Sequence, residues 1–224
     1  MRKNKNQKIV AIVIVALVTI AMIVPSFAMM FSDKNNSNTV YSKGTNSAAQ
    51  GLQSQINSFS QAVQSNPQDT ATRLNLANAY YDLAMVTLGG NTPDQAGPLF
   101  KQATAEYQEV LKTQKDINVL VDLATAAFYG GEVELADKTF KEALLEKPDF
   151  LNALANYGIF LMNAKSDYMG AIKQWNTALT TANPSAEDKE RLNGFIKMAQ
   201  EKLQSSFEQS GSMNNPGAST SGAK

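Results

Sequence analysis

The side chains of this sequence that are able to do chemistry are mainly carboxylates, because the chain contains no histidine and no cysteine. Without histidine it lacks the commonest general base and transition-metal ligand, and without cysteine it lacks thiolate sites and disulfides. Two acidic pairs stand out, Glu132 with Glu134 and Asp188 with Glu190. Each pair lies at an expected helix start, where acids interact favourably with the helix dipole, so we interpret both as structural.

Other signatures of catalysis are also missing. The pairs Gly89-Gly90 and Gly130-Gly131 lack the preceding strand and the lysine of a phosphate-binding loop. No Gly-x-Ser-x-Gly pattern occurs, and no group of acids has the spacing of a calcium loop. The sequence therefore predicts a protein that is not an enzyme and that needs no metal or cofactor.

The N-terminus has the pattern of a membrane segment. Residues 1–8 hold four Lys or Arg and no acid, and no charge follows Lys8 before Asp33. The apolar stretch 9–31 has 23 residues, and about 20 helical residues span the hydrocarbon core. Because basic residues stay on the cytoplasmic side, we expect a single-pass membrane protein whose C-terminal part is extracytoplasmic.

A cleaved signal peptide is the alternative interpretation of the same residues. It has the same basic start and apolar core, and Ser26-Phe27-Ala28 resembles a cleavage site. The uninterrupted apolar run, residues 9–24, is longer than the usual core of a signal peptide, which favours the anchor. Cleavage near Ala28 would instead release a secreted protein.

The formal net charge of zero divides unevenly along the chain. The four cations of residues 1–8 leave 16 cations against 20 acids in the remainder, a net charge of −4. A mildly acidic exported part does not attract polyanions, so we expect no nucleic-acid partner.

Polar segments bracket a helical domain. Residues 32–46 and 208–224 are rich in Asn, Ser and Gly, and we expect a flexible linker and a disordered tail. Between them, residues 47–207 show apolar side chains at spacings of three and four, which predicts eight helices. Thr92 followed by Pro93 predicts one helix start, and Ser185 with Asp188 predicts another.

The predicted helices repeat in pairs. The second helix of each pair carries Ala, an aromatic residue four positions later and Ala three positions after that, and this occurs three times. The first helix of each pair carries a large residue, then a small one, then a further core residue. Small residues let two helices approach closely, and the aromatic fills the space that remains. A proline follows the second and third pairs, at Pro148 and Pro184, and Pro67 follows Phe59 and Ala62, which resemble the second half of a degenerate unit.

This pattern resembles the tetratricopeptide repeat family, whose unit has 34 residues. Residues 116–150 fit it best, residues 151–185 fit with about one extra residue near 166–170, and residues 70–115 fit with an insertion around 85–94. The resemblance implies an all-α, right-handed superhelical solenoid of about 3 to 3.5 units with a capping last helix. The expected repeat core consists of Ala77, Tyr80, Ala96, Phe100, Ala103, Leu123, Ala124, Ala136, Phe140, Ala143, Pro148, Gly158, Ala171, Trp175 and Ala178.

The resemblance also implies a concave groove, lined by the first helix of each pair, that binds an extended peptide. Some members of the family grip a carboxylate there with Lys or Arg, but these helices offer only Arg73 at the edge, so we do not expect that mode. Asn and Tyr suit a peptide, because an amide both donates and accepts hydrogen bonds and a tyrosine adds rigid contact area. The expected groove residues are Asn75, Asn78, Tyr81, Asp82, Asn118, Asp122, Thr125, Phe128, Tyr129, Asn152, Asn156, Ile159 and Asn163.

Two hypotheses for function follow. The first is a membrane-anchored bacterial scaffold of the tetratricopeptide type, tethered through residues 9–31, that binds a protein or an extended peptide. The second is a secreted structural module that forms homo-oligomers through the ends of the solenoid or through the helix 47–65.

Overall fold

The computed structural model describes residues 40–90 and 92–213. Within these residues every regular element is a helix, which confirms the predicted all-α class, and the chain separates into two compact units at Pro148. The first unit holds α3 (Val40–Ser65), α4 (Thr70–Leu88), the 3₁₀ turn η2 (Pro93–Gln95), α5 (Ala96–Leu111), α6 (Ile117–Tyr129) and α7 (Val133–Glu146). The second holds α8 (Leu151–Phe160), the π-helical turn η3 (Leu161–Lys165), α9 (Tyr168–Thr181) and α10 (Ala186–Met213).

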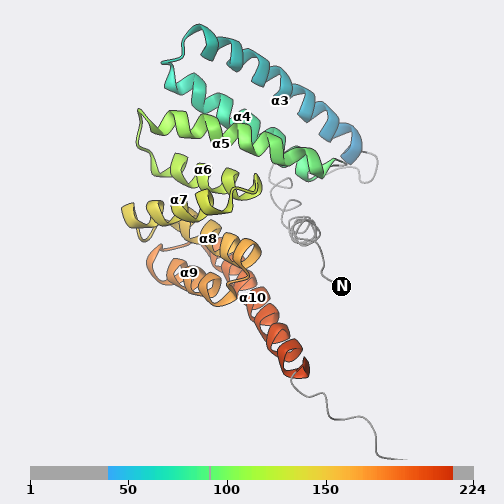
Figure 1. Cartoon of the computed structure of the whole chain (residues 1–224), viewed down its shortest axis with the longest axis vertical. Coiled ribbons are helices and arrows are strands. Elements are labelled where there is room, and N and C mark those ends of the chain that lie inside the picture. Colours follow the sequence, from blue (N-terminus) through green and yellow to red (C-terminus); the bar gives the residue numbers. More distant parts are fainter. Residues whose placement is uncertain (1–39, 91, 214–224) are drawn as a thin grey trace, which may run out of the picture. The chain divides into compact units, whose positions relative to one another are not determined.

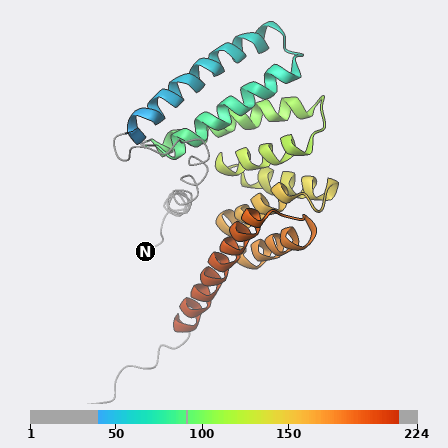
Figure 2. The same ribbon diagram turned by 180° about the vertical axis from the view of Figure 1, so that it is seen from behind.

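The helices of the first unit pack in chain order. Each contacts the next, from α3 on α4 to α6 on α7, and they lie side by side in both views (Figures 1 and 2). Short connections force consecutive helices to run antiparallel, so α4 with α5 and α6 with α7 form the two hairpins predicted from the repeat. Phe100, Ala103 and Phe140 of the second helices are fully buried, as expected of the repeat core.

Helix α3 covers the apolar edge that the first hairpin would otherwise expose. Its buried residues Ile56 and Val63 pack against Leu76, Ala79 and Leu83 of α4. The spacing of seven residues between Ile56 and Val63 places them on one face of a helix. The helix begins at Val40, so it also includes residues 40–46, which the sequence had placed in the flexible linker.

The second unit is organised around Trp175. The side chain of Trp175 on α9 is fully buried, and its Nε1 donates a hydrogen bond of 3.0 Å to the carbonyl oxygen of Ala155 on α8. The ring also packs against Phe195 of α10, with 5.4 Å between the ring centroids. It lies so close to α8 at Gly158 that a Cβ atom there would overlap the indole. This explains why the repeat has a small residue at this position.

The extra residue expected near 166–170 is accommodated slightly earlier. The last turn of the first helix widens into the π-helical turn η3, and Ser166 then adopts a left-handed backbone with φ of 54°. A single π turn is the usual way for a helix to absorb one inserted residue. The insertion expected at 85–94 is likewise taken up by the long helix α4 and the turn η2.

The predicted helix starts have mixed outcomes. The Ser185 hydroxyl accepts a hydrogen bond from the Asp188 amide at 3.1 Å and bonds its carboxylate at 2.7 Å, which confirms the predicted cap of α10. The start predicted at Thr92 is confirmed in position, because Thr92 is the N-cap and Pro93 begins the 3₁₀ turn η2 that runs directly into α5. The Thr92 side chain itself makes no capping hydrogen bond. Caps that were not predicted are formed by Asp69, Asp116 and Asp167.

Two terminal predictions fall partly or wholly beyond the described residues. Helix α10 continues to Met213, into the segment expected to be a disordered tail, and residues 214–224 lie outside the description. Within residues 40–90 and 92–213, no helix is both long enough and apolar enough to cross a membrane. The predicted membrane segment, residues 9–31, lies outside these residues.

The contact of Gly158 with Trp175 makes a prediction about stability. We expect Gly158→Ala to lower the free energy of unfolding by about 2 kcal/mol, because the added methyl overpacks a buried contact. Gly194→Ala on α10 is the matched control, since nothing lies near its Cβ position, and it should stabilise the helix by about 0.5 kcal/mol. Urea denaturation followed by circular dichroism measures both. Equal effects of the two substitutions would contradict the close approach.

Candidate partner-binding face

Helices α4 and α6 each present polar side chains along one stripe. On α4, Asn75, Asn78 and Asp82 are exposed, and their spacing of three and four residues places them on one face. On α6, Asn118 and Asp122 are exposed four residues apart. We call the surface formed by Asn75, Asn78, Tyr81 and Asp82 of α4 with Asn118, Asp122 and Tyr129 of α6 the α4–α6 face.

Two tyrosines of this face converge on one buried phenylalanine. The fully buried ring of Phe100 on α5 contacts Tyr81 of α4 edge to face, with 5.5 Å between centroids, and stacks on Tyr129 of α6 at 5.1 Å. Phe128 in turn contacts Tyr129 at 4.7 Å. Both tyrosines are half-buried, so each rests on the core while part of its surface stays accessible. The repeat core thus fixes the positions of these two side chains.

A third tyrosine, which the sequence analysis had not placed at the site, orients Asn78. The hydroxyl of Tyr107 on α5 donates a hydrogen bond of 2.8 Å to the Oδ1 atom of Asn78, and Tyr107 is almost fully buried. This bond fixes the orientation of the amide of the exposed Asn78, whose NH₂ group is a hydrogen-bond donor. The available signal was a tyrosine on an apolar stripe, because a buried hydroxyl needs a hydrogen-bond partner.

The carboxylates of the α4–α6 face lie in an unfavourable electrostatic environment. Asp122 keeps contact with solvent, but the surrounding helices displace enough water to raise its pKa to about 6, with smaller contributions from Asp116 and Asp82. Desolvation also raises the pKa of Asp82. Burial raises the pKa of Tyr129 to about 12. Among the described residues, no Lys or Arg forms an ion pair with Asp82 or Asp122.

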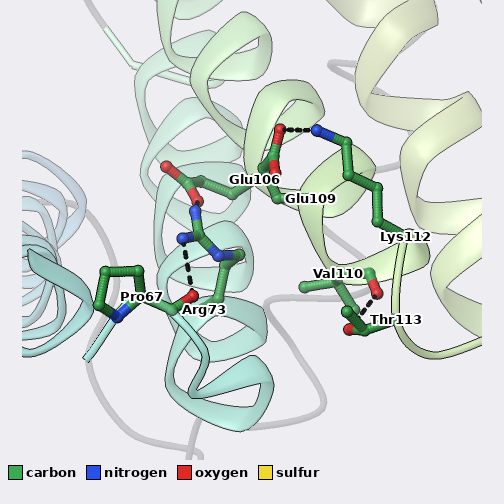
Figure 3. Close-up of polar contacts among 7 residues, drawn as sticks. All are labelled: Pro67, Arg73, Glu106, Glu109, Val110, Lys112 and Thr113. Carbon is green, nitrogen blue, oxygen red and sulfur yellow. Dashed lines mark hydrogen bonds and ion pairs between the residues drawn. The ribbon is translucent and has the colours of Figure 1, made fainter.

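The one cation at the edge of these helices is already engaged. Arg73 of α4 donates to Glu106 of α5 at 2.7 Å and to the carbonyl oxygen of Pro67 at 3.2 Å (Figure 3). On the same helix as Glu106, Glu109 pairs with Lys112 at 2.6 Å. Arg73 therefore ties α4 to α5 and to the preceding turn, and its guanidinium is not offered to a ligand.

Two of the predicted groove residues form hydrogen bonds within α6 or with its N-cap residue. Thr125 is buried and its hydroxyl donates to the carbonyl oxygen of Val121 at 2.7 Å, so it does not belong to an exposed surface. Asn118 is exposed, but its amide group donates to Asp116, the N-cap of α6. The residues predicted for the third repeat lie in the second unit, where Asn152 is exposed, Asn156 and Ile159 are half-buried, and Asn163 falls in the π turn.

A cleft elsewhere in the first unit contains none of the predicted groove residues. It has a volume of about 590 Å³ and lies between α3, the second half of α4 and the beginning of α5. Its lining includes Gln50, Gln53, Leu83, Thr87, Asp94 and Leu99.

The two acidic pairs lie at the starts of α7 and α10, and the Oε2 atom of Glu132 is buried without a hydrogen-bond partner in the described part of the chain. Asp188 is committed to the cap of α10 and to Arg191, whose guanidinium donates to it at 2.7 Å. Glu134 lies in the first turn of α7, where an acid is expected. Across residues 40–90 and 92–213, no three carboxylates come close enough together to hold a metal ion.

Comparisons with known proteins give only loose matches. No family model and no curated protein matches the sequence. Among solved structures, the match to a crystal structure of MamA covers 68% of this chain and 89% of the MamA chain, at 14% identity and a TM-score of 0.48. The match to a second MamA structure covers 83% of this chain and 100% of that MamA chain, at 12% identity and a TM-score of 0.44. Yeast Tom70 is 13% identical, and the match covers 76% of this chain and 55% of that one, with a TM-score of 0.32.

The raised pKa of Asp122 predicts how stability depends on pH. The native-state value of about 6 lies above the ordinary value of about 3.9, so the folded protein binds this proton more tightly than the unfolded chain. The stability that comes from protonated Asp122 is present at pH 4 and is lost as the pH rises through 6. At pH 7 we therefore expect Asp122→Asn to raise the free energy of unfolding by at most about 1 kcal/mol, a figure reduced for solvent screening.

The same substitution should have little effect on the free energy of unfolding near pH 3, roughly one unit below the unfolded pKa, where both states are largely protonated. Chemical denaturation at several pH values measures this difference. Glu142→Gln, at an exposed carboxylate of α7, is the control and should change stability little at any pH. A gain from Asp122→Asn that stayed constant from pH 4 to pH 7 would contradict the assignment.

Proposed function

We propose that this protein is a membrane-tethered, extracytoplasmic scaffold of the tetratricopeptide type that binds a protein partner through the α4–α6 face. The observation that supports this best is the convergence of Tyr81 and Tyr129 on Phe100. Rigid aromatic side chains supported from below, beside amide groups, are the composition that protein-binding surfaces favour. A partner strand placed along the face would meet the NH₂ group of Asn78 and both tyrosine hydroxyls.

Tethering and location are proposed from the sequence. The four cations of residues 1–8 and the apolar stretch 9–31 support an anchor whose following residues are extracytoplasmic. The polar residues that come next would keep the helical units clear of the bilayer surface. A scaffold held at a membrane needs no catalytic group, which agrees with the absence of His and Cys from the sequence.

The second candidate is a secreted, self-associating module. It is supported by the possible cleavage site near Ala28 and by large apolar side chains with high exposure, which include Leu145 at 84% and Met169 at 64%. Cell fractionation separates the candidates. A tethered scaffold is expected in the membrane fraction at full length, whereas a soluble extracellular product beginning at Met29 would support the secreted module.

The binding role can be tested by crosslinking the full chain in its native membrane and identifying the proteins attached to it. The informative variant combines Asn75→Ala, Tyr81→Phe and Tyr129→Phe, because it removes polar groups and keeps both rings on Phe100. We expect it to reduce recovery of the partner about tenfold, which corresponds to about 1.4 kcal/mol, without changing the melting temperature.

A matched control carries the same types of substitution in the second unit. Asn176→Ala, Asn193→Ala and Tyr168→Phe alter positions that are exposed or half-buried there. Recovery of the partner should be unchanged in this control. If both triple variants captured the partner as well as the unaltered chain does, the α4–α6 face would not be the binding surface.

A further inference from the structure

The α4–α6 face carries two carboxylates whose charge nothing in the described structure balances. We propose that the segment it binds is basic, with a Lys or Arg side chain that lies over Tyr81 and Tyr129 and ends between Asp82 and Asp122. This inference rests on the proposed function, and it adds the chemistry of the partner. It differs from the carboxylate-binding mode known in the tetratricopeptide family, since the charge of the ligand is opposite.

The first argument is electrostatic. Asp82 and Asp122 lie on the exposed stripes of α4 and α6, and, after burial, both contribute to the raised pKa of Tyr81 and of Tyr107. Desolvation disfavours both charges, and Asp116 at the start of α6 adds a third acid. The nearest cation of α4, Arg73, is held by Glu106. A cation brought by a ligand would therefore remove an unfavourable interaction that already exists in the free protein.

The second argument concerns the tyrosines. Within residues 40–90 and 92–213, neither the Tyr81 hydroxyl nor the Tyr129 hydroxyl forms a hydrogen bond. Burial raises the pKa of both groups, so both are poorly solvated. The backbone of an extended segment supplies donors and acceptors for these hydroxyls. The aliphatic stem of Lys or Arg packs on tyrosine rings, and its cation is attracted by their faces.

Other occupants fit the face less well. An anionic segment would be repelled by Asp82, Asp116 and Asp122 together. A purely apolar segment would desolvate the two carboxylates further and would offer them no hydrogen bond or opposite charge. A metal ion is disfavoured because the described residues contain no group of three ligating side chains. A cationic side chain, with several donors on a flexible stem, matches two separated carboxylates and the rings beside them.

The test uses the full chain in an uncharged detergent and fluorescent peptides of about ten residues, a length suited to an extended segment. The peptides share one sequence and carry Lys, Gln or Glu at alternate positions. Fluorescence anisotropy measures their affinities. We expect the Lys peptide to bind at least about tenfold more tightly than the Gln peptide, and the Glu peptide not to bind.

Variants assign the effect to the face. Asp82→Asn with Asp122→Asn should weaken binding of the Lys peptide at least about tenfold and keep the shape of both side chains. Glu142→Gln with Glu146→Gln removes the same charge from exposed positions of α7 and should leave the affinity within about twofold. Equal binding of the Lys and Gln peptides, or equal losses in the two double variants, would overturn the proposal.

The crosslinking experiment separates this inference from the proposed function. If the Asn75, Tyr81 and Tyr129 variant loses the partner and the Asp82 and Asp122 variant keeps it, the face binds a protein but the basic chemistry is wrong. If neither variant loses the partner, both proposals fail. A loss of self-association on mutation of Asp82 and Asp122, measured by sedimentation, would identify a second copy of the chain as the occupant and overturn the inference.

Discussion

The contact between a buried aromatic ring of each second helix and the helix before it underlies the rest of the structure. In the first unit, Phe100 of α5 is the point on which α4 and α6 meet, because Tyr81 contacts its edge and Tyr129 its face. In the second unit, Trp175 lies against Gly158, where no larger residue fits. Dense packing of this kind sets the separation of the helices, and the separation sets which side chains meet on the surface.

The candidate binding face is for this reason a continuation of the core. Phe100 supports Tyr81 and Tyr129, and the buried hydroxyl of Tyr107 holds Asn78. Side chains fixed in advance lose little conformational freedom when a partner binds, so they are well suited to recognition. The carboxylates Asp82 and Asp122 are placed by the same helices but have no cation near them, and that imbalance gives the face its expected preference for a basic segment.

Local rules predicted much of the architecture. The spacing of apolar residues located the helices, because that pattern acts between neighbours in sequence. The small residue of the repeat marked the close contact at Gly158. Thr92 begins the helical stretch as predicted, but the stretch starts with a 3₁₀ turn and the Thr92 side chain makes no capping bond. The extra residue of the third repeat was placed a few positions late, because a helix is able to widen into a π turn before it ends. Neither outcome follows from residue types alone.

The sequence by itself determined the helical class, the paired repeats, the cap at Ser185 and the exclusion of His and Cys chemistry. It also determined the apolar stretch 9–31 and the excess of acid in the remainder. Only the tertiary structure decided that Arg73 forms an ion pair with Glu106, that Thr125 is buried, and that the Tyr107 hydroxyl donates a hydrogen bond to Asn78. These pairings join residues about 30 positions apart or depend on burial, and both are set by how helices pack rather than by any local pattern.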